Sequence, residues 1–102
     1  MEKEKLFVYG TLKDSKVQED LLHMHVNGNR DLLRGFRSGN VHIENRDYKI
    51  IEEDSDSKET IEGLVLELSM NKLRVLDKYE GKNYRRKKVK LTSGNEAWAY
   101  IK

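Results

Sequence analysis

Cysteine and proline are both absent from this sequence of 102 residues. Without cysteine there is no disulfide, no thiolate zinc ligand and no thiol nucleophile. Long apolar stretches are missing too, because no run approaches the roughly 18 residues that a membrane-spanning helix needs. The charged opening segment, residues 1–5, lacks the features of a signal peptide. We therefore expect a soluble, cytoplasmic protein.

A dominant charge of either sign is also lacking. Charged residues make up 37% of the chain, yet the formal net charge is only +2. This balance argues against disorder driven by charge repulsion and against a dedicated nucleic-acid binder, which usually shows a basic excess. The hydrophobic fraction of 36% is low for a globular protein, but this length still allows one small core. We expect a single domain over residues 1–102.

The order of the predicted elements indicates an α+β fold. A first helix is predicted over residues 16–26, behind a capping box formed by Ser15 and Gln18. A second is predicted over residues 70–79, with Ser69 as its N-cap. This is not a regular alternation of strands and helices, so we expect a mixed sheet with two helices. Strands are predicted at residues 5–9, 32–36 (with a bulge at Gly35), 41–44, 48–52, 60–68, 84–92 and 96–101, and a turn at residues 38–40.

The first motif with chemical content is the apolar strand that stops at Gly10. A glycine at this point lets the backbone bend with a positive φ. The N–H groups of Gly10, Thr11 and Leu12 would then have no strand partner and could form a concave site for a carboxylate or an oxyanion. The alternative is an ordinary tight turn whose N–H groups bind water.

The second motif is Glu80, a carboxylate at the predicted end of the second helix. Leu73, Leu76 and Glu80 fall on one helix face, so Glu80 points inward if the leucines face the core. Burial and the negative end of the helix would both raise its pKa, which suits a general acid or base near neutral pH. The alternative is an exposed glutamate at a fraying helix end. Asp77, one turn earlier, is expected to face outward or to bond to the following loop.

The histidines and the basic run give weaker indications. His23 and His25 diverge on a helix and His42 is isolated, whereas a zinc site needs at least three clustered ligands. The basic run of residues 85–90 is interpreted as a solvated face of a strand, with the acidic residues 52–59 as candidate partners within the molecule. The alternative is an interaction surface for RNA or an acidic protein, which would bind with a steep salt dependence.

Together, three segments resemble the gamma-glutamylcyclotransferase-like family: Val8-Tyr9-Gly10-Thr11-Leu12, Leu76-Asp77-Lys78-Tyr79-Glu80-Gly81 and Tyr84-Arg85-Arg86. That family has an opening Tyr-Gly-(Thr/Ser)-Leu loop and a late Leu-Asp-x-(Tyr/Phe)-Glu motif followed by Tyr-x-Arg. Residues 62–65 and 97–100 resemble its mid-chain and closing strands. The resemblance therefore spans nearly the whole chain in the right order.

The resemblance implies a small mixed β-barrel of about six strands with two flanking helices. It also implies cyclisation of a γ-glutamylamine or γ-glutamyl peptide, with release of 5-oxoproline and a free amine and with no cofactor or metal. Glu80 matches the family's catalytic glutamate. The residues expected to bind the substrate are Tyr9, Gly10, Thr11, Leu12 and Tyr84.

Two departures from the family leave the substrate open. Many relatives carry Tyr-Pro where this chain reads Tyr48-Lys49-Ile50. The chain is also short, which leaves little material for loops that close over a substrate. The alternative function is a non-catalytic module that binds a small carboxylate or amino-acid ligand in the same pocket.

Overall fold

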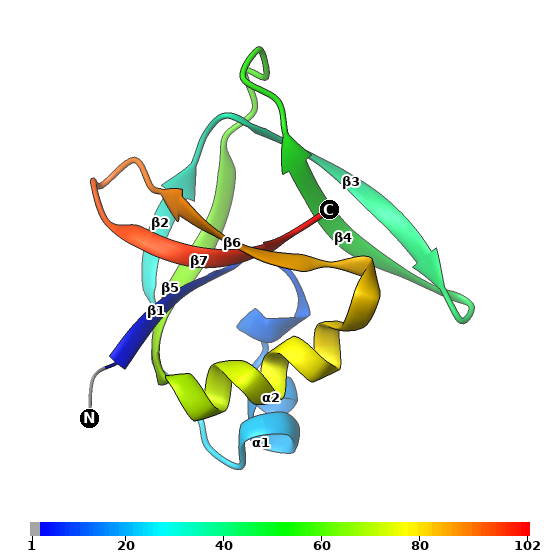
Figure 1. Cartoon of the computed structure of the whole chain (residues 1–102), viewed down its shortest axis with the longest axis vertical. Helices are drawn as coiled ribbons and strands as arrows, with labels where there is room; N and C mark the ends of the chain where they lie inside the picture. The colour runs from blue at the N-terminus through cyan, green and yellow to red at the C-terminus, as the bar shows by residue number, and fades with distance from the viewer. Residues whose placement is uncertain (1–2) are drawn as a thin grey trace.

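The computed structural model describes residues 3–102, and its main element is an open five-stranded sheet (Figure 1). The strand order is β2-β5-β1-β7-β6. β1 runs parallel to β7, where Leu6 lies opposite Trp98, and the other neighbours are antiparallel. The strands are β1 (Lys3–Val8), β2 (Asn29–Leu33), β5 (Ile61–Ser69), β6 (Arg85–Lys90) and β7 (Glu96–Ile101).

Two helices pack against one face of this sheet. α1 (Ser15–Leu22) follows the short 3-10 turn η1 (Thr11–Lys13), and α2 (Met70–Glu80) follows β5 and runs into a second 3-10 turn, η2 (Gly81–Asn83). No helix within residues 3–102 has the length and apolar character to cross a membrane. Leucines from η1, both helices and two strands form the apolar layer between them: Leu6, Leu12, Leu22, Leu66, Leu68, Leu73 and Leu76, with Val8 and Tyr100.

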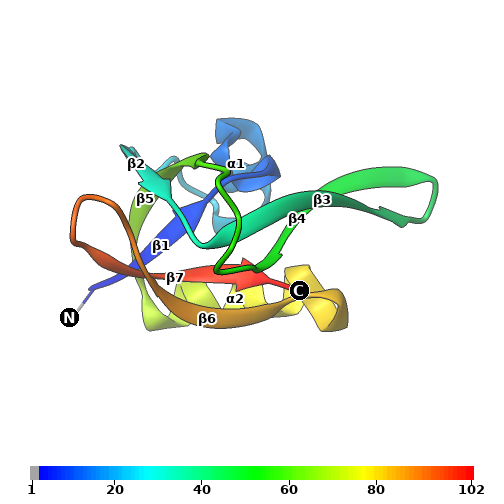
Figure 2. The same cartoon turned by 90° about the horizontal axis from the view of Figure 1, so that it is seen from above.

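The other face of the sheet is covered by a separate two-stranded hairpin of β3 (Phe36–Ile43) and β4 (Arg46–Glu53). The base of this hairpin is held in a second apolar cluster through Phe36 and Ile51, and Lys102 N donates to Ile51 O at 2.8 Å. Seen from above, the outer part of the hairpin projects away from the main sheet (Figure 2). The hairpin therefore has an anchored base and an outlying tip.

The α+β class is confirmed, but a closed barrel is not. The described part of the chain contains seven strands rather than about six, and the main sheet is open, with β2 and β6 at its edges. The hairpin covers one face instead of joining the two edges. The barrel implied by the family resemblance is therefore replaced by a sheet with a layer on each side.

The second helix begins and ends where the sequence predicted. Ser69 Oγ accepts from Lys72 N at 3.3 Å, and Gly81 ends the helix with φ of +67°. A side-chain oxygen at the N-cap and a glycine with positive φ at the end are the usual signals for a helix of this kind. Local sequence signals therefore determine where α2 begins and ends.

The first helix differs at both ends. Asp14, not Ser15, is the N-cap, since its Oδ1 accepts from Lys16 N at 2.8 Å. Gln18 does not complete a capping box, because its buried amide bonds to Leu12 O at 2.8 Å and to Val26 N at 2.9 Å. The helix stops at Leu22, followed by His23 with φ of 57°.

The predicted strand at residues 32–36 is divided between two strands, since Leu32 and Leu33 end β2 and Phe36 begins β3. Gly35, with φ of +85°, lies in the turn between these strands and not in a bulge. The predicted turn at residues 38–40 is wrong, because β3 runs straight through it. The hairpin turn lies at Glu44 and Asn45, within one or two residues of the gap between the predicted strands 41–44 and 48–52. Both residues have positive φ, as a two-residue hairpin turn requires.

Candidate active site

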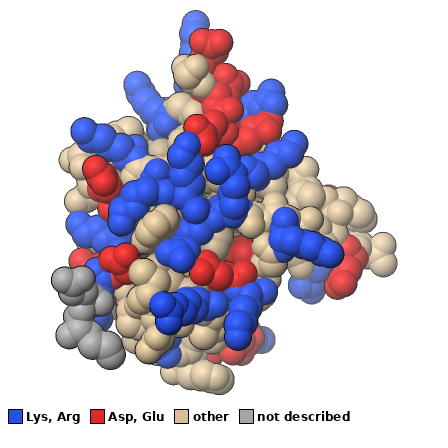
Figure 3. Space-filling model, viewed as in Figure 1, with Lys and Arg blue, Asp and Glu red and all other residues tan. Residues whose placement is uncertain are grey.

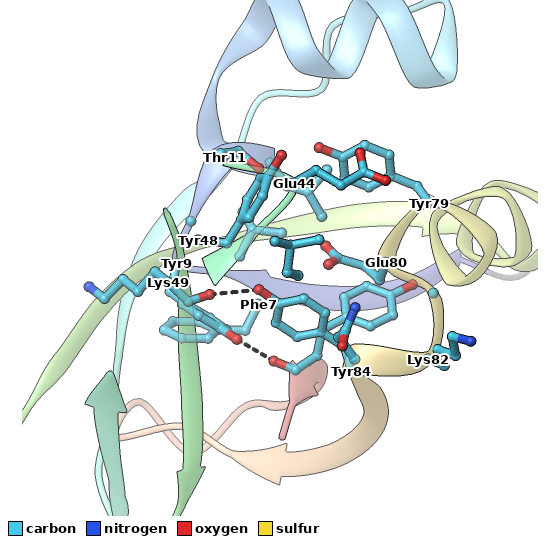
Figure 4. A pocket seen from close by; sticks show the side chains of 17 residues that line it. Phe7, Tyr9, Thr11, Glu44, Tyr48, Lys49, Tyr79, Glu80, Lys82 and Tyr84 are labelled. Atoms are coloured by element: carbon cyan, nitrogen blue, oxygen red, sulfur yellow. Dashed lines mark hydrogen bonds between the residues drawn. The ribbon is translucent and has the colours of Figure 1, made fainter. Parts of the chain in front are cut away.

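A cavity of about 380 Å³ opens where the end of β1, the end of α2 and the outer hairpin meet (Figure 4). It contains both sequence motifs, although they are some 70 residues apart in the chain. Its lining residues are Phe7–Leu12, Ile43, Glu44, Tyr48, Lys49, Tyr79–Tyr84 and Tyr100. The structure thus places Glu80, Tyr84 and the four loop residues Tyr9, Gly10, Thr11 and Leu12 around one space.

The Glu80 side chain points from the end of α2 into this cavity (Figure 4). Leu73 and Leu76 on the same helix face are fully buried, which explains why Glu80 is turned inward. No hydrogen bond or ion pair joins its carboxylate to another residue in the range 3–102. Burial raises the pKa of Glu80 from its ordinary value to about 7, because desolvation disfavours the charged form.

Two of the tyrosines that line the cavity, Tyr9 and Tyr84, have their hydroxyls bonded to backbone carbonyls. Tyr9 donates its hydroxyl to the carbonyl of Tyr100, and Tyr84 donates to Lys49 O at 3.0 Å. Burial, followed by the charge of Glu80, raises the pKa of Tyr84 to about 12. These hydroxyls therefore stay protonated near neutral pH and give the cavity polar walls without added charge.

The loop after β1 differs from its prediction in conformation. Gly10 has a φ of −122°, so the predicted positive φ is wrong. The N–H groups of Gly10, Thr11 and Leu12 nevertheless have no acceptor within residues 3–102, because η1 begins here and its first bond is Lys13 N to Gly10 O at 3.1 Å. The first residues of a helical turn always leave such donors open. All three residues line the cavity.

The wall contributed by the hairpin was not predicted. Ile43, Glu44, Tyr48 and Lys49 line the cavity from β3, the turn and β4. The sequence indicated a hairpin here, but only the docking of its base through Phe36 and Ile51 determines where the tip lies. No local pattern encodes that placement.

The sequence predicted that Asp77 would face outward or bond to the following loop, but it bonds to the two strands after that loop. Its carboxylate accepts from Arg86 Nε at 3.0 Å and from Arg86 Nη2 at 3.2 Å, and the hydroxyl of Tyr100 donates to it at 2.7 Å. Because of this pair, Arg86 is not part of a freely solvated face. The end of α2 is tied to the two strands that follow it.

The rest of the basic run is partly neutralised. Lysine and arginine side chains gather over β6 in Figure 3. Lys87 pairs with Glu53, and Arg85 Nη2 lies 3.6 Å from the same carboxylate, which confirms the acidic segment as a partner within the molecule. No cluster of three or more potential metal ligands is found within residues 3–102.

The sequence model described as gamma-glutamyl cyclotransferase, AIG2-like, matches residues 6–102. The chain belongs to this family. The match covers both motifs of the cavity and all seven strands except the first residues of β1. No curated protein matches the chain significantly.

Several solved structures share the fold of this chain. A protein from Arabidopsis thaliana is 24% identical, with a TM-score of 0.80, over 99% of this chain and 69% of that one. An AIG2-like protein from Mus musculus is 20% identical, with a TM-score of 0.79, over 100% and 78%. A structure described as gamma-glutamyl cyclotransferase is 16% identical, with a TM-score of 0.74, over 98% and 66%. At these identities the likeness concerns the fold.

Proposed function

We propose that this member of the gamma-glutamyl cyclotransferase, AIG2-like family cyclises a γ-glutamylamine or γ-glutamyl peptide. The α-amine of the glutamyl group attacks its own side-chain amide carbonyl. One C–N bond forms and the original amide C–N bond breaks, so that the products are 5-oxoproline and a free amine. The reaction consumes no water and needs no redox partner.

Glu80 is the proposed general acid and base. It takes a proton from the α-ammonium group and returns one to the departing nitrogen. A carboxyl with a pKa of about 7 can do both near neutral pH, since efficient proton transfer needs a pKa close to the working pH. The open N–H groups of Gly10, Thr11 and Leu12 are the proposed donors to the anionic part of the substrate.

The observation that carries this proposal is the shared cavity. Glu80 lies in it without a partner of its own, beside the loop that opens with Tyr9. Holding a flexible glutamyl chain in a curled pose supplies much of the barrier reduction in an intramolecular reaction, and this requires no metal or nucleophile. A cavity of about 380 Å³ has the size of a small-molecule site.

The decisive experiment is a screen of γ-glutamyl compounds for 5-oxoproline, with the wild-type protein and Glu80→Gln side by side. Both γ-glutamylamines and γ-glutamyl dipeptides belong in the screen, because the leaving amine is open. We expect turnover by the wild type and a loss of at least about a hundredfold in kcat for Glu80→Gln, the size typical of a general acid-base residue. Glu96→Gln, an exposed change in β7 away from the cavity, is the control.

Equal rates for the wild type and Glu80→Gln would show that the catalytic assignment is wrong. If neither turns over any compound but both bind γ-glutamyl ligands in calorimetry, the chain is a binding module that uses the same cavity. The two functions are therefore separated by one set of proteins.

The proposed base also predicts a pH profile. Glu80 must be ionised to accept the first proton, so kcat/KM should rise with pH and level off above a midpoint near 7, in line with its pKa of about 7. Initial rates between pH 5 and pH 9 measure this. A midpoint near 4.5, the ordinary value for glutamate, would mean that Glu80 is solvated in the working enzyme.

A further inference from the structure

Asp77 lies one helical turn before Glu80 and is held by two strands at once. Its Oδ1 accepts from Arg86 Nε at 3.0 Å and from the Tyr100 hydroxyl at 2.7 Å, and its Oδ2 accepts from Arg86 Nη2 at 3.2 Å. Arg86 and Tyr100 are directly opposed on β6 and β7. The last turn of α2 is therefore fastened to the end of the sheet by three hydrogen bonds.

Tyr100 is also connected to the loop after β1. Its carbonyl accepts the hydroxyl of Tyr9, while its own hydroxyl bonds to Asp77. The residue is almost fully buried and lines the cavity. One residue thus links the segment that begins at Tyr9 with the turn that ends at Glu80.

The contact between Asp77 and Arg86 is suited to orientation. A guanidinium that meets a carboxylate through two parallel bonds fixes both distance and angle, which lysine cannot do. The Arg86 guanidinium lies 4.4 Å from the centre of the Trp98 ring, which limits its movement further. Its remaining nitrogen, Nη1, is buried without an acceptor among the residues described, and such a donor lowers stability.

Among residues 3–102, no side-chain bond fixes the position of the Glu80 carboxylate, so its place depends on the helical turn that carries it. That turn is closed by the bond from Gly81 N to Asp77 O. We infer that Asp77, Arg86 and Tyr100, here called the bracket, are positioning residues that keep the Glu80 carboxyl buried opposite the Tyr9–Leu12 loop. The inference rests on the proposed function, since it assigns a role to residues around the proposed base.

The bracket can be tested by a measurement that needs no turnover. The side-chain carboxyl carbon of Glu80 is followed by NMR during a pH titration of the wild type, Asp77→Asn and Tyr100→Phe. Asp77→Asn replaces one of the two carboxylate oxygens that accept from Arg86 by an amide nitrogen, which donates. Tyr100→Phe removes only a hydroxyl. The titratable groups that face Glu80 across the cavity are Tyr9, Glu44, Tyr48, Lys49, Tyr79, Lys82, Tyr84 and Tyr100, and the two variants leave all of them in place except the Tyr100 hydroxyl.

We expect the midpoint for Glu80 to lie near 7 in the wild type and to fall toward 4.5 in both variants, because the loosened turn lets the carboxyl reach water. Arg85→Gln is the matched control. Arg85 is the neighbour of Arg86 on the opposite face of β6, and its contacts are the exposed ones to Glu53 and Lys102 O. Its removal should leave the midpoint unchanged.

Turnover gives the second readout. Displacing a catalytic group by about 1 Å can lower the rate on the order of a hundredfold, so kcat should fall between tenfold and a hundredfold in Asp77→Asn and Tyr100→Phe while KM changes little. The inference would be overturned if both variants, Asp77→Asn and Tyr100→Phe, fold and keep the wild-type titration midpoint of Glu80 and the wild-type kcat. Should Glu80→Gln alone keep full activity, the proposed function falls, and the titration still decides whether the bracket holds Glu80.

Discussion

A single carboxylate sets the character of the cavity. Glu80 stands on the same helix face as two fully buried leucines, and burial rather than a neighbouring charge raises its pKa to about 7. An ionised group in such a place opposes folding, because the unfolded chain hydrates it better. The residue best suited to proton transfer should therefore also be a weak point for stability.

Replacing Glu80 by glutamine should stabilise the protein at alkaline pH. The folded-state pKa lies above the ordinary 4.5, so the native state binds the proton more tightly and loses stability as the pH rises from about 4.5 to about 7. At pH 8 the full effect is present, and Glu80→Gln should raise the free energy of unfolding by up to about 3 kcal/mol. Below pH 4.5 this advantage should vanish.

Urea unfolding of both proteins at pH 4.5 and pH 8 measures this difference. The exposed Glu96→Gln serves again as the control and should show no comparable pH-dependent gain. A Glu80→Gln protein that is no more stable than the wild type at pH 8 would contradict the buried, raised-pKa state of this side chain.

At the scale of the elements, local signals decided some boundaries and tertiary contacts decided others. Ser69 and Gly81 predicted α2 correctly because a cap and a stop act within one helical turn. Gln18 misled the prediction of α1, since its amide is used for the buried bonds to Leu12 O and Val26 N. The predicted turn at residues 38–40 failed for a related reason. Small polar residues also occur in exposed hairpin strands, whereas the hairpin predicted between strands 41–44 and 48–52 has its turn within one or two residues of the expected place, at Glu44 and Asn45.

The candidate site, too, was predictable where local signals decide and hidden where tertiary contacts decide. Glu80 and the loop from Tyr9 to Leu12 could be found because each has a sequence signature. The partners of Asp77 could not, since nothing local pairs it with Arg86 or with Tyr100. The hairpin wall was equally hidden, because its place depends on how Phe36 and Ile51 dock against the sheet.

Close packing of strands also makes one glycine indispensable. A Cβ at Gly63 in β5 would lie 2.5 Å from Val8 O and 2.7 Å from the ring of Phe7. Gly63→Ala should therefore destabilise the protein by about 3 kcal/mol, at the upper end of what overpacking usually costs. Because Phe7 and Val8 lead directly into the cavity loop, ligand binding should weaken as well.

Gly39→Ala in β3 is the matched comparison for thermal or urea unfolding. A Cβ there meets nothing within 4 Å, and the change should alter stability by no more than about 0.5 kcal/mol in either direction. Equal stabilities for the two alanine variants would show that β1 and β5 are not packed as closely as described.

For the whole molecule, the protection of backbone amides against hydrogen exchange should decrease from the centre of the sheet to the tip of the hairpin. β1 lies between β5 and β7 and has an apolar cluster on each face. The outer hairpin, from Asn40 to Lys49, is half-buried or exposed throughout, and the Tyr84 hydroxyl bonds it to the body by donating to Lys49 O. Regions with few buried contacts open more often than the core.

Amide hydrogen exchange should therefore be slowest in β1 and the paired parts of β5 and β7, and fastest in residues 40–49. If the cavity takes a γ-glutamyl ligand, exchange in residues 43–49 should slow on its addition, because the hairpin forms one wall. Uniform exchange across both sheets, or no ligand effect on the hairpin, would contradict this picture of an anchored base and an outlying tip.

The parallel pairing of β1 with β7 bears on how the protein matures during translation. β1 is made before its neighbour on that side, which follows only after Glu80 and η2 are complete. A nascent chain halted before Glu96 would carry the base and the amide loop, yet it would lack Tyr100, whose carbonyl and hydroxyl join them. The proposed catalytic centre can then assemble only after β7 has been made, so a translation product halted before Glu96 should be inert even though it retains every proposed substrate-binding residue.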